Sequence, residues 1–267
     1  MSEQRTGLAP GTRVVVTGAA RGIGRALASR LAAGGCHVVV NDLDATELGA
    51  VAQRLGAVAV PGDAASEKGV ATLVGAAREA LGGIDVWFGN AGIDRGRGLE
   101  MSEAEWAQSH ETNVMAHVRA ARLLVPEWLD RGAGRYVLTA SAAGLLTMVD
   151  APAYSVTKHA AVAFAEWLSV TYRHRGIVVQ AICPQGVQTD MLARSGDLQE
   201  LLSRDEALAP EAVAETVWAA LGGEKFLILP HPEVAGYYTA RVCNTDIWLA
   251  GMNRLQRKIE GTQEPAR

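Results

Sequence analysis

The chain has 267 residues, of which 49% are hydrophobic, 20% are charged and 5% are aromatic. This length suits one α/β domain, and the composition supplies a large aliphatic core and argues against intrinsic disorder. The formal net charge of -4 includes no run of lysine or arginine, so we expect no nucleic-acid partner.

The amino-terminal residues 1–12 are polar and lack the charged-then-apolar pattern of a secretion signal. No apolar run approaches the length that spans a bilayer, so we expect a cytoplasmic protein with no membrane partner. The three cysteines form no C-x-x-C pair and the six histidines show no ligand spacing, so we predict no disulfide and no metal site.

Short β-branched segments alternate along the chain with longer segments of helical period. The predicted strands are residues 13–18, 36–42, 57–63, 85–92, 134–141, 177–184 and 225–230. The predicted helices are residues 22–35, 44–56, 66–83, 102–131, 154–175 and 210–221. Strands that are apolar throughout are typical of a parallel sheet covered by helices on both faces. The sequence therefore predicts an α/β fold with a doubly wound, seven-stranded parallel Rossmann sheet.

We expect a single domain over residues 1–267, with a core at about 12–230 and a C-terminal helical extension at about 231–267. Residues 188–209 follow the end of a predicted strand, where open α/β sheets bind ligands, and are a candidate substrate lid. Apolar side chains recur at helical spacing in the extension, at Val234, Tyr238, Val242, Trp248, Met252, Leu255 and Ile259. This pattern fits a helix pair packed on the core or on a neighbouring subunit, and it fits equally well a pair that closes the substrate pocket.

The first predicted strand leads directly into a glycine-rich turn, T-G-A-A-R-G-I-G, and then into a helix. In this context Gly18 permits the tight turn, Gly22 allows the backbone to approach a pyrophosphate, and Gly24 lets the helix pack closely. The N-H groups at the start of the helix would meet the phosphates. The segment is a candidate dinucleotide site.

The second predicted strand ends in Asp42, at the interval from the glycine turn where an acidic residue binds the adenosine ribose in Rossmann sites. A carboxylate there would repel a 2'-phosphate, which favours NAD over NADP. Arg21 instead favours NADP, because its guanidinium could bind the 2'-phosphate through two hydrogen bonds. We favour NAD and leave NADP as the alternative.

Tyr154 and Lys158 lie four residues apart in the segment YSVTK, which places both side chains on one face of a predicted helix. A free tyrosine has a pKa of about 10, and lowering that pKa to 7 takes about 4 kcal/mol of differential stabilisation. Lys158 and an oxidised nicotinamide ring are plausible sources, since nearby cations favour the phenolate. By itself the Y-x-x-x-K spacing fits a surface pair as well.

The glycine turn, the segment GNAG after the fourth strand, Asn113, Ser141 and YSVTK together resemble the short-chain dehydrogenase/reductase family, over about residues 12–230. The resemblance implies that Tyr154 is the general acid/base, that Lys158 binds the nicotinamide ribose and lowers the tyrosine pKa, that Ser141 orients and polarises the substrate oxygen, and that Asn113 holds a water of the proton relay. It also implies an adenine contact at Asp63 and a homodimer or homotetramer.

Pattern and resemblance together predict the residues that contact the cofactor. They are Gly18, Arg21, Gly22, Ile23, Gly24, Asp42, Asp63, Ala64, Asn90, Ala91, Gly92, Tyr154, Lys158, Pro184, Gly186, Val187 and Thr189.

Two positions depart from the family's motifs. Gly89 stands where the family has the first asparagine of N-N-A-G, and Gln185 stands where it has the glycine of P-G-x-V-x-T. Neither departure touches the four catalytic positions, so we expect hydride transfer between a nicotinamide and a secondary alcohol or ketone. The alternatives are an NADP(H)-dependent carbonyl or 3-oxoacyl reductase and a catalytically silent nucleotide-binding sensor or scaffold.

The substrate pocket is expected between residues 94–99, residues 143–151, the candidate lid and the C-terminal extension. Its predicted apolar wall consists of Ala142, Ala143, Leu145, Leu146, Met148 and Val149. We therefore expect a hydrophobic small-molecule substrate.

Overall fold

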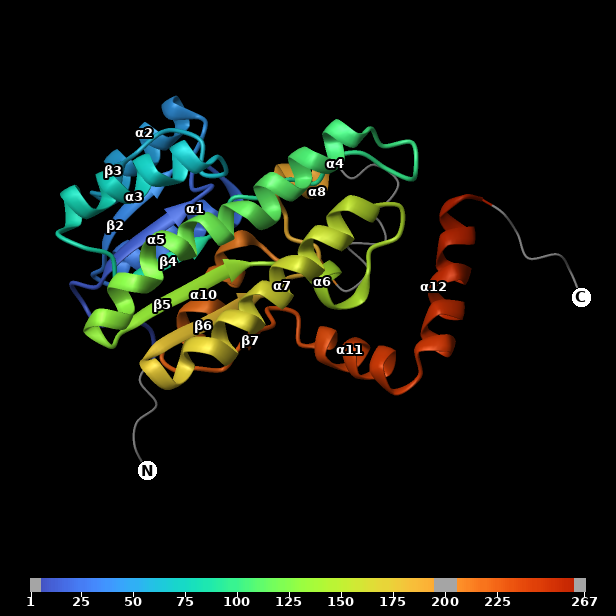
Figure 1. The fold of residues 1–267 in the computed structure, drawn as a ribbon. Coiled ribbons are helices and arrows are strands. Elements are labelled where there is room, and N and C mark those ends of the chain that lie inside the picture. Colours follow the sequence, from blue (N-terminus) through green and yellow to red (C-terminus); the bar gives the residue numbers. More distant parts are fainter. Residues whose placement is uncertain (1–5, 195–205, 262–267) are drawn as a thin grey trace, which may run out of the picture.

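A computed structural model of the protein describes residues 6–194 and 206–261. Its strands are β1 (Arg13–Thr17), β2 (His37–Asn41), β3 (Val58–Ala59), β4 (Val86–Gly89), β5 (Gly134–Thr139), β6 (Ile177–Ile182) and β7 (Leu227–Ile228). They form one parallel sheet in the order β3-β2-β1-β4-β5-β6-β7 (Figure 1). The predicted seven-stranded Rossmann sheet is confirmed, although β3 and β7 are shorter than expected.

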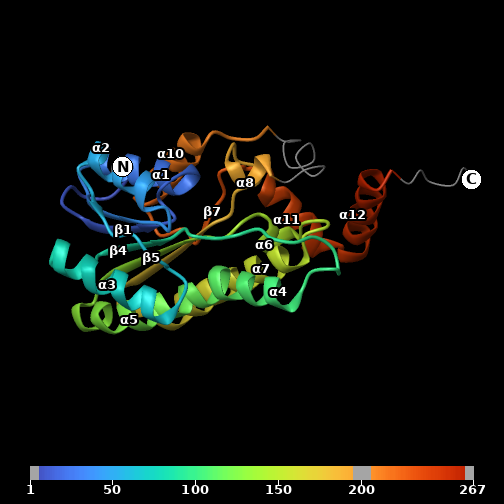
Figure 2. The same ribbon diagram turned by 90° about the horizontal axis from the view of Figure 1, so that it is seen from above.

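Helices cover both faces of this sheet (Figure 2). One face carries α1 (Gly22–Ala33), α2 (Ala45–Leu55) and α10 (Pro210–Ala220). The other face carries α3 (Glu67–Leu81), α4 (Glu103–His110), α5 (Ala116–Arg131) and α7 (Pro152–Tyr172). Because both faces are covered, the strands are largely apolar on both sides, as the sequence pattern indicated.

The hydrophobic core is accordingly divided between the two faces. Val15, Trp87 and Tyr136 belong to the cluster under α3, α5 and α7. Val16 and Phe88 belong to the cluster under α1 and α10. Neighbouring strand residues thus point to opposite sides of the sheet, as the pleat requires. This packing fixes the sheet whose carboxyl edge carries the site.

The predicted helix over 102–131 is interrupted. It begins with a capping box, in which Ser102 Oγ accepts from the backbone N-H of Glu105 (3.3 Å) and the Glu105 carboxylate accepts from that of Ser102 (2.9 Å). After α4 the chain forms a π-helix, Glu111–Met115, before α5 continues. A π-helix is a local irregularity that occurs frequently at functional sites, and this one holds Asn113.

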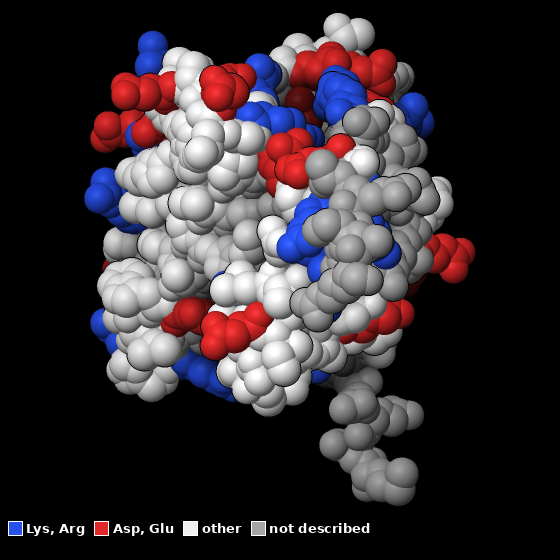
Figure 3. Space-filling model, turned by 90° about the vertical axis from the view of Figure 1, so that its right-hand side faces the viewer, with Lys and Arg blue, Asp and Glu red and all other residues white. Residues whose placement is uncertain are grey.

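The extension forms α11 (Glu233–Cys243) and α12 (Thr245–Ile259), which confirms the predicted helix pair. Val234 of α11 is fully buried in the core, and Arg241 donates hydrogen bonds to the Leu145 carbonyl and to His159. By contrast, α12 has no fully buried residue and stands at one end of the molecule (Figure 1). That end carries charges of both signs beside a broad uncharged area (Figure 3). Residues 262–267 lie outside the described residues.

The predicted lid is described only at its two ends. α8 (Asp190–Ala193) follows its start, and Val187 forms a parallel bridge with Leu208. Residues 195–205 lie outside the described part of the chain. Among the helices that are described, none has the length and apolar character needed to cross a membrane.

Candidate active site

A cavity of about 1440 Å³ lies at the carboxyl ends of the strands, where doubly wound sheets bind ligands. Single ligand pockets typically measure about 300–1,000 Å³, so this cavity has room for a dinucleotide and a substrate together. All seventeen residues predicted to contact the cofactor line it. Loops that follow five different strands thus bring together motifs separated by up to 171 residues of sequence (Gly18 to Thr189).

The glycine turn leaves no room for side chains. Gly18 has φ +64°, and a Cβ there would lie 2.9 Å from the Cα of Ala91. A Cβ at Gly24 would meet the carbonyl oxygen of Gly18, which confirms the close packing expected of that glycine. The first turn of α1 has no side-chain cap, because the N-cap residue Arg21 makes no capping hydrogen bond. Its backbone N-H groups are therefore suited to phosphate oxygens, and this cradle fits a dinucleotide.

Asp42 lies in the cavity beside the glycine turn. Its carboxylate accepts hydrogen bonds from the backbone N-H groups of Ala20 (3.0 Å) and Asp44 (3.2 Å), which hold it in place. Arg21 pairs with Asp44 (2.8 Å) and with Asp190 (3.4 Å). The guanidinium that could meet a 2'-phosphate is therefore already engaged by two carboxylates, neither of which was predicted as its partner.

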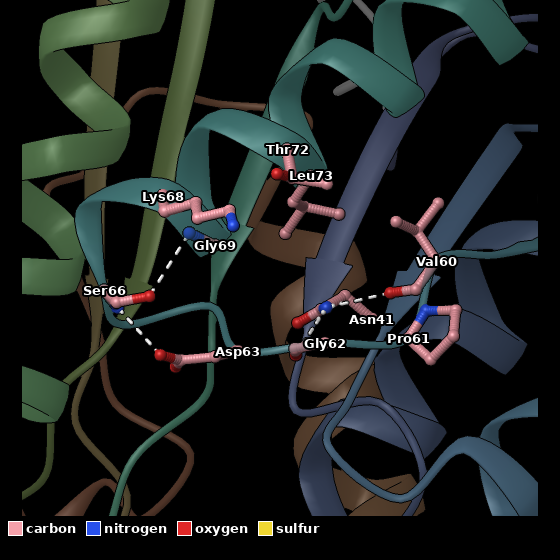
Figure 4. A pocket seen from close by; sticks show the side chains of 10 residues that line it. All are labelled: Asn41, Val60, Pro61, Gly62, Asp63, Ser66, Lys68, Gly69, Thr72 and Leu73. Atoms are coloured by element: carbon pink, nitrogen blue, oxygen red, sulfur yellow. Dashed lines mark hydrogen bonds between the residues drawn. The ribbon is translucent and has the colours of Figure 1, made fainter.

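Asp63 lies further along the same edge, next to a smaller hollow (Figure 4). Its carboxylate accepts from the backbone N-H groups of Ala65 (2.8 Å) and Ser66 (3.1 Å). Desolvation raises the pKa of Asp63, but these hydrogen bonds outweigh it and the pKa lies below its ordinary value. The Asn41 amide donates to the carbonyls of Val60 (2.9 Å) and Gly62 (3.0 Å), so the loop that presents Asp63 and Ala64 is fixed from both sides (Figure 4).

Ser141, Tyr154 and Lys158 line the cavity together. Ser141 follows β5, and the other two lie in the first turns of α7. The Lys158 Nζ lies 5.6 Å from the centre of the Tyr154 ring and donates to the Thr139 carbonyl (2.9 Å). Ser141 Oγ accepts from the backbone N-H of Ala143 (3.1 Å), which orients the hydroxyl. The structure thus brings three of the four predicted catalytic side chains to one wall.

Burial shifts the pKa of both titratable groups on this wall toward the neutral form. Desolvation, opposed by a hydrogen bond with Ser141, raises the pKa of Tyr154 to about 12. Desolvation lowers the pKa of Lys158 to about 8. The protein alone therefore keeps Tyr154 as a phenol at neutral pH, ready to donate a proton. A further positive charge in the cavity would favour the phenolate.

Asn113, the fourth predicted catalytic residue, is buried behind this wall. Its side-chain oxygen accepts from the Ile93 N-H (2.9 Å), and its amide donates to the Ile93 carbonyl (2.9 Å) and to Thr157 Oγ1 (3.0 Å). The side chain therefore ties the loop after β4 to α7. A Cβ at Gly92 would lie 3.2 Å from both Asn113 Oδ1 and Lys158 Nζ, so this glycine also permits a close approach.

The departure at Gly89 has a structural reason. A Cβ at this position would lie 2.6 Å from Nδ1 of His117, so the imidazole occupies the space that a larger residue would need. His117 is buried, and desolvation lowers its pKa to about 3. At the second departure, the backbone N-H of Gln185 donates to His231 Nδ1 (3.2 Å). Sequence reasoning missed both histidines, because neither belongs to a motif.

The substrate half of the cavity is largely apolar. Five residues of the predicted wall line it, namely Ala142, Ala143, Leu146, Met148 and Val149. Leu145 does not, because it packs in the core and is 3% exposed, and Leu99 at the end of the expected 94–99 loop is 92% exposed. The extension contributes Tyr237, Trp248, Met252 and Leu255. Val234, Tyr238 and Trp248 of the extension also pack in or against the hydrophobic core, so the extension both packs on the core and borders the pocket.

Comparison with known proteins agrees with this site. The family model of short chain dehydrogenases matches residues 12–200. A 1-deoxy-11-beta-hydroxypentalenate dehydrogenase of Streptomyces exfoliatus is 35% identical over 82% of each chain. The hydroxyacyl-CoA dehydrogenase ChsB1 of Mycobacterium tuberculosis is 33% identical over 82% of this chain and 77% of its own.

A solved short-chain dehydrogenase/reductase of Burkholderia phymatum, in complex with NAD, superimposes with a TM-score of 0.82 at 30% identity and covers 89% of this chain and 95% of its own. The chain belongs to the short-chain dehydrogenase/reductase family. It is an NAD(P)-dependent oxidoreductase that acts on CH-OH groups.

Proposed function

We propose that this protein interconverts a secondary alcohol and a ketone with NAD(H), with Tyr154 as the general acid/base. The observation that carries the proposal is that Ser141, Tyr154 and Lys158 line the same cavity as the glycine turn. A surface tyrosine-lysine pair would not share a cavity with a nucleotide cradle. A nicotinamide bound there would supply or accept the hydride.

The side chains of this wall have complementary tasks. Tyr154 donates its phenolic proton to the oxygen of a ketone, or takes up the proton of an alcohol in the reverse direction. Ser141 holds the same oxygen by a hydrogen bond that strengthens as negative charge develops on it. Lys158 lies close enough to favour the phenolate when it is charged. Asn113 holds a water of the proton relay, and its side chain also holds the loop after β4 against α7.

Two features of the site and one comparison favour NAD over NADP. The Asp42 carboxylate borders the cavity and would repel a 2'-phosphate. Arg21, which could compensate for this repulsion, is engaged by Asp44 and Asp190. The related structure from Burkholderia phymatum contains NAD.

The substrate we propose is a small hydrophobic molecule. Apolar residues of α6 (Ala143–Leu146), the following loop and α12 form its walls. One relative is named for the oxidation of a hydroxylated pentalenate and another for that of a hydroxyacyl-CoA, which agrees with a secondary hydroxyl on an apolar body.

We further propose that the protein is cytoplasmic and forms a homodimer or homotetramer through α5 and α7. On α7 the side chains of Val156, Trp167 and Val170 are 56%, 54% and 83% exposed. Such a run of exposed apolar side chains on one helix is typical of a surface that a neighbouring subunit covers.

Steady-state rates with NAD(H) and NADP(H), followed at the absorbance band of the reduced nicotinamide over a panel of hydrophobic secondary alcohols and ketones, test the proposal. We expect turnover with NAD(H) and much slower turnover with NADP(H). Faster turnover with NADP(H) would overturn the cofactor assignment. Tight NAD binding without turnover of any compound would favour a silent nucleotide-binding protein instead.

A further inference from the structure

The face of α12 that borders the cavity combines apolar and cationic side chains. Trp248, Met252 and Leu255 follow each other at intervals of four and three residues and are half-buried. Arg254 and Lys258 lie on the same side of the helix, are exposed, and also line the cavity. The helix therefore presents an apolar stripe bordered by two positive charges, and basic side chains lie in the central part of the face that Figure 3 shows.

The acidic side chains in the substrate half of the cavity already have cationic partners. Asp94 pairs with Arg97 (2.9 Å), Glu111 with Arg119 (2.5 Å), and Asp190 with Arg21 (3.4 Å). Arg254 and Lys258, in contrast, make no ion pair with any residue in the described ranges 6–194 and 206–261. Among the described residues, the rim of the cavity at α12 thus carries two cations that no ion pair compensates.

The two cations repel each other along the helix. Arg254 and Lys258 are four residues apart, and like charges at this spacing destabilise a helix. The two acidic residues of this segment lie elsewhere, since Asp246 is in the first turn and Glu260 accepts a hydrogen bond from Gln256 (2.8 Å). An anion bound between the two cations would remove their repulsion.

We propose that Arg254 and Lys258 bind an anionic group, such as a carboxylate, at the end of the substrate that lies away from the reacting carbon. The substrate class is then an apolar alcohol or ketone that carries an acid group. This inference rests on the proposed function for the identity of the reacting end. The recognition of the anion depends only on α12 and on the apolar wall.

Two fluorescent probes of nearly the same shape test the proposal directly. One is 1-anilinonaphthalene-8-sulfonate, which is anionic, and the other is N-phenyl-1-naphthylamine, which has the same aromatic body without the sulfonate. Each is titrated into the full-length protein and into the variants Arg254→Gln, Lys258→Gln and the double variant. The matched control is Arg257→Gln, which removes the same charge from the same helix but does not line the cavity.

We expect each cavity-facing substitution to weaken binding of the sulfonate probe by about fivefold at low salt, because exposed ion pairs are worth up to about this factor. The loss should shrink as salt is added. The uncharged probe should bind all variants alike, and Arg257→Gln should change neither affinity. Equal affinity of the sulfonate probe for the wild type and the double variant would overturn the proposal.

These titrations do not require turnover, so they test the anion site on α12 independently of the proposed oxidoreductase function. Charge-dependent probe binding in a protein that turns over nothing would overturn the proposed function and leave the anion site standing. If the protein turns over apolar ketones but binds the sulfonate probe equally well with and without both substitutions, the anion site alone is overturned.

Discussion

At the scale of single residues, Asp42 and its surroundings decide the choice of cofactor. Removing the carboxylate in Asp42→Ala removes the repulsion of a 2'-phosphate, so kcat/KM with NADP(H) should rise by about tenfold, which corresponds to about 1.4 kcal/mol. The kcat/KM with NAD(H) should fall, because the variant loses the contact between the Asp42 carboxylate and the adenosine ribose. Steady-state kinetics with both cofactors measure the change. Glu47→Gln, which neutralises a nearby carboxylate outside the cavity, is the control and should leave the preference unchanged.

The buried His117 should make the stability of the protein depend on pH in the acidic range. Burial lowers its pKa from 6.5 to about 3, so between these values the unfolded chain binds a proton that the folded chain does not. Stability should therefore fall as the pH is lowered through this range, by at most about 1.4 kcal/mol per pH unit. Urea unfolding at pH 7 and pH 4.5 checks this expectation. In His117→Leu the free energy of unfolding should fall less between pH 7 and pH 4.5. An equal fall in this variant and in the wild type would show that other groups cause it.

Much of the site at this scale could be predicted from the sequence, because motif residues follow strand ends and parallel strands end at one edge. All predicted cofactor residues line the cavity for this reason. The partners of Arg21 could not be predicted, since no motif identifies Asp44 or Asp190 as an acceptor for its guanidinium. The position of the His117 imidazole against Gly89 could not be predicted either, because no sequence motif links α5 with β4.

At the scale of elements, the sequence predicted which segments are helical better than where their geometry changes. The capping box at Ser102 is a local pattern and marks the start of α4 correctly. The π-helix that follows has no such local signal, and the sequence predicted one uninterrupted helix over residues 102–131. For α12 the periodicity identified the helix, but only the structure places its apolar face on the cavity.

Two substitutions on α12 test its part in substrate binding. Trp248→Ala and Leu255→Ala each remove apolar surface from the cavity wall, so KM should rise by about five- to thirtyfold, equivalent to about 1–2 kcal/mol. The value of kcat should change little, since neither side chain lies on the catalytic wall. Leu249→Ala is the control, because Leu249 is 58% exposed and does not line the cavity. An equal change in KM for the control would mean that α12 acts through stability instead.

At the scale of the whole molecule, the sheet was the most predictable feature. Seven apolar segments separated by helices leave a parallel doubly wound sheet as the simplest arrangement that buries both faces. The position of α12 was not predictable. The helix is amphipathic and its partly buried Trp248 packs against the core, but none of its residues is fully buried, so core packing fixes it less firmly than it fixes α7.

The proposed subunit contact belongs to this scale as well. Introducing charge into the exposed apolar side of α7, in Trp167→Glu and Val170→Glu, should favour smaller assemblies, because an unpaired charge is costly to bury between subunits. Analytical ultracentrifugation measures the mass. Val242→Glu, at a site that is 66% exposed on α11, is the matched control. A wild-type protein that sediments as a monomer would rule out the contact.

The measurement that tests the account most directly compares NAD binding and turnover in the wild type and in Tyr154→Phe, the latter lacking only the phenolic oxygen. We expect NAD affinity to stay within about twofold, because the glycine turn and Asp42 are untouched, and turnover to fall by about 100- to 10,000-fold, the usual contribution of a general acid/base. Near-normal turnover in Tyr154→Phe would contradict the assignment of Tyr154 and with it the proposed mechanism.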